Sequence, residues 1–258
     1  ISLIDMQTTT INIPKEKIEQ FKKDGYFVVE SVIPNEHVEL LREVCQSAID
    51  ETDAEMDRQG TDVMGINHRG KRYFMKAEPN HPRIREFIFS DLMASITRAV
   101  FGDEIYYKSD QYVVKFDKTG MKFSWHQDSG YAQARLGDHP EVLSCWCTLD
   151  EVNEDNGTVY LLPMSRYGEK KLAEHIVEEG SNDRIGYFGN DPGEPVIAPA
   201  GSIAVFSSLT FHRSGANPTG KKRRVYLAQY TASPMPGGHA IDANKLFIKD
   251  GQVQPNLY

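Results

Sequence analysis

The sequence predicts a mainly β fold with flanking helices, in the class of sandwiches, barrels and jelly rolls. Between residues 105 and 232, about seven runs rich in β-branched and aromatic residues follow one another at fairly even spacing, as they do in such folds. The turns DKTG, NEDNG, PAG and NPTGKK carry the Gly, Asn, Asp or Pro residues that tight reversals need. A chain of 258 residues is long enough to form this fold as one domain.

The strand-like runs define an expected jelly-roll core at residues 105–232. In order, they are IYYKSDQYVVKF, KFSWHQD, VLSCWCTLDEV, GTVYLLPMS, EPVIAP, SIAVFSS and RRVYLAQYTA. No internal repeat or low-complexity linker divides them. We therefore expect a single domain over residues 6–258, with residues 233–258 as a C-terminal extension.

Residues 6–104 are expected to form a mostly helical α/β segment ahead of this core. The pattern predicts a helix at 15–25, a strand at 26–33, a long amphipathic helix from 35 to about 57, a polar loop at 58–71, a strand at 72–77 and a helix at 82–101. Residues 1–5 precede the first methionine, Met6, and we expect them to be a remnant of expression.

Composition argues against several functional classes. A net charge of −8 opposes binding of nucleic acid over a broad surface, because neutralising phosphates needs a basic face. No apolar run approaches the ~18 residues that span a bilayer, and no export signal opens the chain. We expect a soluble cytoplasmic protein without a nucleic-acid or membrane partner.

The cysteines are too few and too poorly placed for a disulfide framework. Cys45, Cys145 and Cys147 are the three, and the last two point to the same face of a predicted strand. Such a pair cannot easily close a disulfide. We expect buried free thiols in a reducing compartment.

Three residues form a candidate metal site. His126 and Asp128 stand two positions apart on a predicted strand, so alternation places both side chains on one face. Alone, this pair is weak, because a histidine in a strand is more often a hydrogen-bonded core residue. His212 lies 84 residues after Asp128, enough chain to cross a jelly roll and return. Two histidines and one carboxylate form the facial triad of non-haem Fe(II) oxygenases, which leaves positions open for a co-substrate and O2. The remaining histidines are interpreted as surface or core residues.

Two residues near His212 suit a dicarboxylate co-substrate. Arg223 lies 11 positions after His212, at the head of the strand RRVYLAQY, and Ser214 lies two positions after it. A dicarboxylate held at one end by a metal needs a cation and a hydroxyl at its other end, and the planar fork of arginine meets a carboxylate with two hydrogen bonds. On spacing alone, a solvated basic turn formed by residues 221–224 explains the pattern equally well.

The series FKKDGYFVV, WHQD, NEDNGTVYLLPMSR and HRSGANPTGKKRRVYL resembles the phytanoyl-CoA dioxygenase family, from about residue 21 to residue 232. The resemblance implies a double-stranded β-helix, a cupin-like jelly roll, that uses Fe(II), 2-oxoglutarate and O2. It implies His126, Asp128 and His212 as the iron ligands. Arg223 and Ser214 would hold the distal carboxylate of 2-oxoglutarate, with Gln111 and Lys115 as further contacts. The presence of Asp128 sets the chain apart from the halogenases, in which Gly or Ala stands there.

The segment NHRGKRYFMK at 67–76 carries four positive charges in an acidic chain. We expect it to bind the substrate at the mouth of the barrel, with an anion clamp and an aromatic wall that would hold a quaternary ammonium by cation–π attraction. The candidate residues are Asn67, Arg69, Arg72, Tyr73, Tyr112 and Tyr131. The segment also looks similar to an oxoanion site in the aminoalkylphosphonate hydroxylases of the family, so an aminoethylphosphonate-like zwitterion, with or without N-methylation, is the hypothesis. A solvent-exposed basic loop and aromatic core packing are the simpler interpretations.

Two other functional interpretations remain open at this stage. The same chemistry could act on an amino acid, an ectoine-like solute or an acyl thioester, although the phosphates of a coenzyme A thioester would need a longer basic surface. Alternatively, the chain could be a non-catalytic jelly-roll protein that only binds a metal, which would leave no reason for Arg223 and Ser214. The sequence does not determine the oligomeric state.

Overall fold

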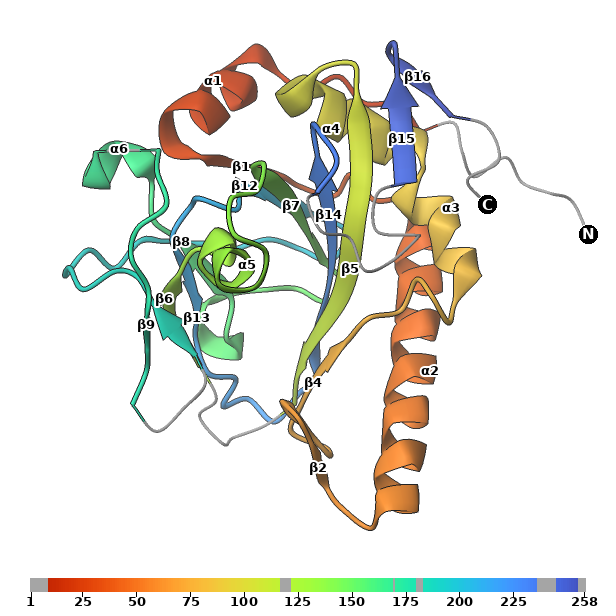
Figure 1. The fold of residues 1–258 in the computed structure, drawn as a ribbon. Helices are drawn as coiled ribbons and strands as arrows, with labels where there is room; N and C mark the ends of the chain where they lie inside the picture. The colour runs from red at the N-terminus through yellow and green to blue at the C-terminus, as the bar shows by residue number, and fades with distance from the viewer. Residues whose placement is uncertain (1–8, 117–121, 169, 180–182, 236–244, 255–258) are drawn as a thin grey trace, which may run out of the picture.

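The computed structural model describes residues 9–116, 122–168, 170–179, 183–235 and 245–254. Within them, two antiparallel β-sheets face each other without closing into a continuous barrel, and helices cover the outer face of the larger sheet (Figure 1). This is the jelly-roll arrangement that the sequence predicts. The expected expression remnant, residues 1–5, lies outside the described residues.

The larger sheet joins four strands of the expected core to strands from both ends of the chain. Its strand order is β1-β12-β7-β14-β5-β4-β3-β2, and β15 pairs with both β5 and β16. Their bounds are β1 Tyr26–Val29, β2 Val63–Met64, β3 Asn67–His68, β4 Arg72–Met75, β5 Ile105–Lys115, β7 Val142–Thr148, β12 Ile203–Ser207, β14 Arg223–Thr231, β15 Lys245–Lys249 and β16 Gln252–Val253.

The smaller sheet has the strand order β11-β8-β13-β6. Its strands are β6 Phe123–His126, β8 Val159–Leu161, β11 Glu194–Pro195 and β13 His212–Ser214, and a separate pair joins β9 Ile176–Val177 to β10 Arg184–Ile185. Every predicted strand run therefore contains an observed strand. The sequence did not reveal β13, because three residues are too few to show a period of two.

The helices supply the outer layer and the connections. They are α1 Lys15–Asp24, α2 Asn35–Gln59, α3 Arg85–Ile88, α4 Asp91–Phe101, α5 Asp128–Leu136 and α6 Met164–Tyr167, with 3-10 turns at η1 Pro82–Ile84 and η2 Glu154–Asn156. Figure 1 shows α2 running along the outer side of the larger sheet. There the Tyr112 hydroxyl of β5 donates a 2.8 Å hydrogen bond to the Leu41 carbonyl of α2.

Strand alternation divides the buried side chains between two cores. On β7, Cys145 and Cys147 face the helices, whereas Trp146 faces the smaller sheet. All three cysteines are free and buried, as the sequence predicts, and burial raises the pKa of Cys45 to about 12. The inner core, between the sheets, also holds Phe206 and Leu161, so the polar groups of the site stand in apolar surroundings.

Three predicted elements differ from the structure. The helix expected at 82–101 is interrupted, because Ser90 begins a new helix by accepting a hydrogen bond from the Met93 amide, as N-cap serines do. The loop expected at 58–71 contains the β2–β3 hairpin. The C-terminal extension is partly sheet, since β15 pairs with β5.

The helix-covered core also contains a histidine without a hydrogen bond. His37 is 1% exposed and packs edge-on against Phe87, with ring centroids 5.6 Å apart. Neither of its ring nitrogens has a partner among the described residues, and burial lowers its pKa. Buried polar groups in this state destabilise a fold.

We expect His37→Phe to raise the free energy of unfolding by about 1 kcal/mol, because the ring contact stays and an unpaired polar group is removed. Urea denaturation of the two proteins at neutral pH measures the change. A lower midpoint for the variant would show that the site cannot accept the larger phenyl ring.

Candidate active site

The three predicted ligands meet between the ends of β6 and β13. His126 is the last residue of β6, His212 is the first residue of β13, and the two are direct partners in the antiparallel register. Asp128 opens α5 rather than lying on the strand, but Gln127 between them is extended, with φ −108° and ψ 137°. Its conformation keeps the side chains of residues 126 and 128 on the same side.

The ligand atoms of these residues converge. One donor atom from each of His126, Asp128 and His212 lies within 4.8 Å of the others. The distance from His212 Nε2 to Asp128 Oδ1 is 3.5 Å, and the two imidazole centroids are 4.2 Å apart. This is the geometry of a group that shares one ion.

Backbone hydrogen bonds select the ring nitrogens that face the ion. His126 Nδ1 lies 2.7 Å from the Ser124 carbonyl, and His212 Nδ1 lies 3.0 Å from the Thr210 carbonyl. Because a carbonyl only accepts, each Nδ1 must carry its proton and donate. Each Nε2 therefore presents a lone pair to the metal, as in histidine sites with a carbonyl behind the ligand.

Electrostatics favours the metal-binding protonation state of His126 and Asp128. Burial, together with the adjacent His212, lowers the pKa of His126 to about 3. Burial alone would raise the pKa of Asp128, but the neighbouring imidazoles hold it below its ordinary value. For His212, burial opposes the charged form, but the Asp128 carboxylate outweighs it and raises the pKa above its ordinary value, so this imidazole has to release its proton when a metal binds. Two imidazoles and a carboxylate are the donor set that fits Fe(II) with open coordination positions.

A polar network fixes the second carboxylate oxygen of Asp128. Oδ2 accepts a 2.9 Å hydrogen bond from the Ser144 hydroxyl and a 3.3 Å bond from Gln229 Nε2. Gln229 Oε1 accepts from Lys108 Nζ at 2.9 Å and from Ser109 Oγ at 3.1 Å. Lysine only donates, so the amide of Gln229 has to turn its NH2 group towards Asp128.

Ser144 and Gln229 are functional residues that the sequence interpretation missed. Both are polar residues at inward positions of apolar strands, β7 and β14. That contrast is the signal that could have found them.

We expect Ser144→Ala and Gln229→Leu each to weaken metal binding by about 10- to 100-fold, the usual range when a partner of a ligand is removed. Anaerobic titration with Fe(II), or with Co(II) as a spectroscopic substitute, measures the affinity. Gln252→Leu, on the exposed strand β16, is the matched control and should bind as tightly as the wild type. Wild-type affinity in both site variants would contradict this role of the network.

Arg223 is buried at the start of β14 with part of its guanidinium unused. It is 1% exposed, and Nη2 donates a 2.6 Å hydrogen bond to the Gly157 carbonyl. Nε and Nη1 are buried without a partner among the described residues. Burial lowers the pKa of Arg223 to about 10. Orphaned donors on a buried cation are the feature that a carboxylate ligand would satisfy, so Arg223 fits the distal carboxylate of 2-oxoglutarate.

The other predicted co-substrate residues lie around Arg223. Lys115 is its direct partner across the β5–β14 register and donates to Ser214 Oγ at 2.8 Å and to the Gly215 carbonyl at 2.6 Å. Burial and the nearby Arg223 lower the pKa of Lys115 well below its ordinary value. Gln111 lies half-buried four residues earlier on the same strand. Arg224 instead forms a two-pronged ion pair with Asp150, at 2.9 and 2.7 Å.

Four of the residues proposed for the substrate are engaged elsewhere. Arg69 pairs with Asp57 at 2.6 Å and Asp62 at 2.8 Å, so this basic position is a structural ion-pair cluster. The Tyr73 hydroxyl donates a 2.7 Å hydrogen bond to Asp53, and the Tyr112 hydroxyl donates to the Leu41 carbonyl of α2. Both tyrosines therefore point towards the helices and not into the site. Asn67 Oδ1 accepts a 2.6 Å hydrogen bond from the Phe74 amide, which joins β3 to β4.

Tyr131 lies beside the triad, and Arg72 lies on the same face of the larger sheet as Lys115. Arg72 is the register partner of Lys115 from the other side, on β4, and Nε donates to the Ile66 carbonyl at 2.7 Å. The Tyr131 ring stands edge-on to His126 at 5.3 Å. Two aromatic residues that the sequence did not single out also lie here. The ring centroids of Phe74 and Phe123 are 5.2 Å apart, and that of Phe123 is 6.3 Å from the His126 ring centroid.

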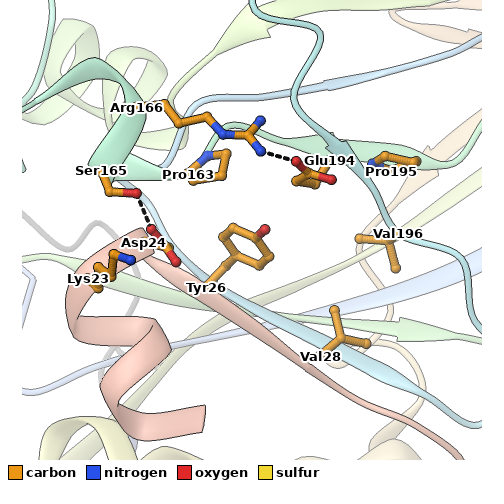
Figure 2. A pocket seen from close by; sticks show the side chains of 10 residues that line it. All are labelled: Lys23, Asp24, Tyr26, Val28, Pro163, Ser165, Arg166, Glu194, Pro195 and Val196. Atoms are coloured by element: carbon orange, nitrogen blue, oxygen red, sulfur yellow. Dashed lines mark hydrogen bonds and ion pairs between the residues drawn. The ribbon is translucent and has the colours of Figure 1, made fainter. Parts of the chain in front are cut away.

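The described residues also line cavities that do not contain the metal ligands. One, of about 420 Å³, opens between β1 and β11, and Figure 2 shows Tyr26 inside it beside the Arg166–Glu194 ion pair. Another, of about 340 Å³, lies along β6 and reaches Phe123 and Ser214. The second cavity therefore borders the site, whereas the first lies at the open seam between the sheets.

The fold and the triad define a non-haem metal oxygenase of the double-stranded β-helix class. The family model for phytanoyl-CoA dioxygenase (PhyH) matches residues 21–225, and the chain belongs to this family. It is a non-haem dioxygenase that depends on Fe(II) and 2-oxoglutarate, so the alternative of a non-catalytic metal-binding protein is wrong.

Known relatives are distant. An ectoine dioxygenase of Stutzerimonas stutzeri (strain A1501) is 23% identical over 229 residues, covering 82% of this chain and 74% of the relative. A probable alpha-ketoglutarate-dependent hypophosphite dioxygenase of Stutzerimonas stutzeri is 26% identical over 230 residues, covering 84% and 78%. EvdO2 from Micromonospora carbonacea var. aurantiaca has a similar fold, with a TM-score of 0.66, 22% identity and coverage of 90% of this chain and 97% of EvdO2.

Among the described residues, no helix has the length and apolar character needed to cross a membrane.

Proposed function

We propose that the protein hydroxylates an unactivated C–H bond of a small zwitterion, of which an aminoethylphosphonate, including its N-trimethylated form, is the best match. The observation that carries this proposal is Arg72, a partly buried cation on the β-sheet that also holds Lys115 and Arg223. When bound, iron and 2-oxoglutarate supply the oxidising chemistry with O2. The residues of the chain bind, orient and select.

Arg223 is the proposed anchor for the distal carboxylate of 2-oxoglutarate. Its free Nε and Nη1 would make charge-assisted hydrogen bonds, which are stronger than neutral ones. Ser214 and Lys115, already joined by a 2.8 Å bond, would place a hydroxyl and a second cation beside it. Gln111 remains a proposed contact further along β5.

We expect Arg223→Leu to weaken 2-oxoglutarate binding by about 10- to 100-fold, because a hydrogen bond to a charged group contributes about 1.5–3 kcal/mol. Anaerobic titration of the Fe(II)-loaded protein, followed by the visible band of the chelate, measures the affinity. Arg224→Leu is the matched control: it breaks the Asp150 pair and should leave this affinity unchanged. Weaker 2-oxoglutarate binding by Arg224→Leu than by Arg223→Leu would instead assign the anchor to Arg224.

The surroundings of Arg72 support an anionic substrate with a cationic end. Burial lowers the pKa of Arg72, while the Asp183 carboxylate raises it, so an incoming anion would also favour its charge. Phe74 and Tyr131 would contribute aromatic surface for a quaternary ammonium. The hypophosphite relative is named for a phosphorus oxoanion, which agrees with this choice.

A second candidate is an ectoine-like solute or an amino acid, which the ectoine dioxygenases among the relatives favour. These compounds carry a carboxylate where the first candidate carries a phosphonate. A screen of succinate release with aminoethylphosphonates, ectoine and free amino acids separates them. Turnover with ectoine alone would replace the first candidate.

We expect Arg72→Leu to raise the KM for the anionic substrate by about 10- to 100-fold through loss of a charged hydrogen bond. The KM for 2-oxoglutarate should stay within about threefold, because Arg223 is intact. Succinate release at varied substrate concentration measures both constants. Arg58→Leu, which removes an exposed arginine of α2, is the control. An unchanged substrate KM in Arg72→Leu would show that this arginine does not bind the substrate.

A further inference from the structure

His175 makes a specific contact with the backbone between two metal ligands. Its Nε2 accepts a 3.0 Å hydrogen bond from the Gln127 amide, and its Nδ1 lies 2.9 Å from the Ala173 carbonyl. Because that carbonyl only accepts, Nδ1 carries the proton and Nε2 is the acceptor. One neutral imidazole therefore joins residues 171–175, hereafter the strap, to the His126-Gln127-Asp128 turn.

The side chain of Gln127 makes the reciprocal connections. It is 0% exposed, and its Oε1 accepts a 2.8 Å bond from the Ala173 amide. Its Nε2 donates to the Lys171 carbonyl at 2.9 Å and to the Leu209 carbonyl at 2.6 Å. Since Leu209 lies three residues before His212, this side chain bonds both segments that carry the ligands, as well as the strap.

Two glycines leave room for the His175 ring. A Cβ added at Gly130, on α5, would lie 2.6 Å from the ring, and one at Gly186 would lie 2.5 Å from Nε2. The Gly186 amide also donates a 2.9 Å bond to the Trp125 carbonyl, next to His126. The ring is thus confined between two segments that adjoin the metal ligands.

We propose that His175 and Gln127 are positioning residues, which hold the two ligand-bearing segments at the spacing that the metal requires. No motif in the sequence marks His175 as functional. Gln127 is the single residue between the ligands His126 and Asp128. Their hydrogen bonds are made to backbone groups on both sides of the triad, so they set the positions of His126 and Asp128 relative to His212. This role goes beyond the proposed function, because it concerns the metal centre whatever the substrate is.

The test compares three substitutions of buried or partly buried histidines. His175→Phe keeps a ring in the slot but removes the acceptor. His175→Gln places an amide oxygen near the former Nε2 and restores an acceptor. His37→Phe, in the helix-covered core, is the matched control without a lost hydrogen bond. Co(II) titration gives the affinity, the Co(II) absorption bands report ligand geometry, and thermal unfolding of the metal-free protein gives stability.

We expect His175→Phe to bind Co(II) about 10- to 100-fold more weakly with altered bands. His175→Gln should recover to within about threefold of the wild-type affinity, and His37→Phe should match the wild type in Co(II) affinity and bands. Gly186→Ala, which displaces the ring without changing it, should resemble His175→Phe. If His175→Phe does not fold, Gly186→Ala and His175→Gln decide the question.

Wild-type affinity and bands in His175→Phe, or in Gly186→Ala if that variant alone folds, would overturn the proposal even if thermal stability falls. Equal losses in His175→Phe and His175→Gln would also overturn it, because restoring the hydrogen-bond acceptor would then have no effect. None of these measurements needs the substrate or 2-oxoglutarate, so failure of the proposed function would leave their result intact.

Discussion

The antiparallel pairing of β6 with β13 is the constraint on which the site depends. It places His212 directly across from His126, although 85 residues of chain separate them. Because the extended Gln127 turns Asp128 to the same side, one register fixes all three ligands. A slip by one residue would turn a ligand to the opposite face. The hydrogen bonds of the strap, of Ser144 and of Gln229 all act on this pairing or on the turn beside it.

Strand alternation on the larger sheet explains which predicted residues reach the site. Lys115 and Arg223 are partners on β5 and β14 and face the smaller sheet, whereas Tyr112 on the same strand faces α2. Tyr73 and Arg72 are adjacent on β4 and diverge in the same way. A period of two therefore separates ligand-binding positions from core tyrosines. The same rule places Cys145 and Cys147 in the helix-covered core.

The fold and the triad could be predicted because their signals are local or ordered along the chain. These signals are the strand runs, the turn residues and the order of the motifs from WHQD to HRSGANPTGKKRRVYL. The ion pairs of Arg69 could not be predicted, because its partners Asp53 and Asp57 lie on α2. The sequence alone does not show that the β2–β3 hairpin folds back onto that helix. His175 lies in a segment without clear periodicity, so only the tertiary structure shows that it contacts Gln127.

Burying the side chains of Arg223 and Lys115 has an energetic cost that an anionic ligand would offset. Arg223 and Lys115 are almost fully buried, and burial, together with the charges of Arg223 and Arg72, lowers the pKa of Lys115 well below its ordinary value. A core that served stability alone would not gather charges of one sign, since desolvation outweighs what a lone neutral hydrogen bond returns. An anion at Arg223 would supply the missing counter-charge. The arrangement thus favours binding over stability, with the apolar inner core supporting it on the sides formed by Trp146 and Phe206.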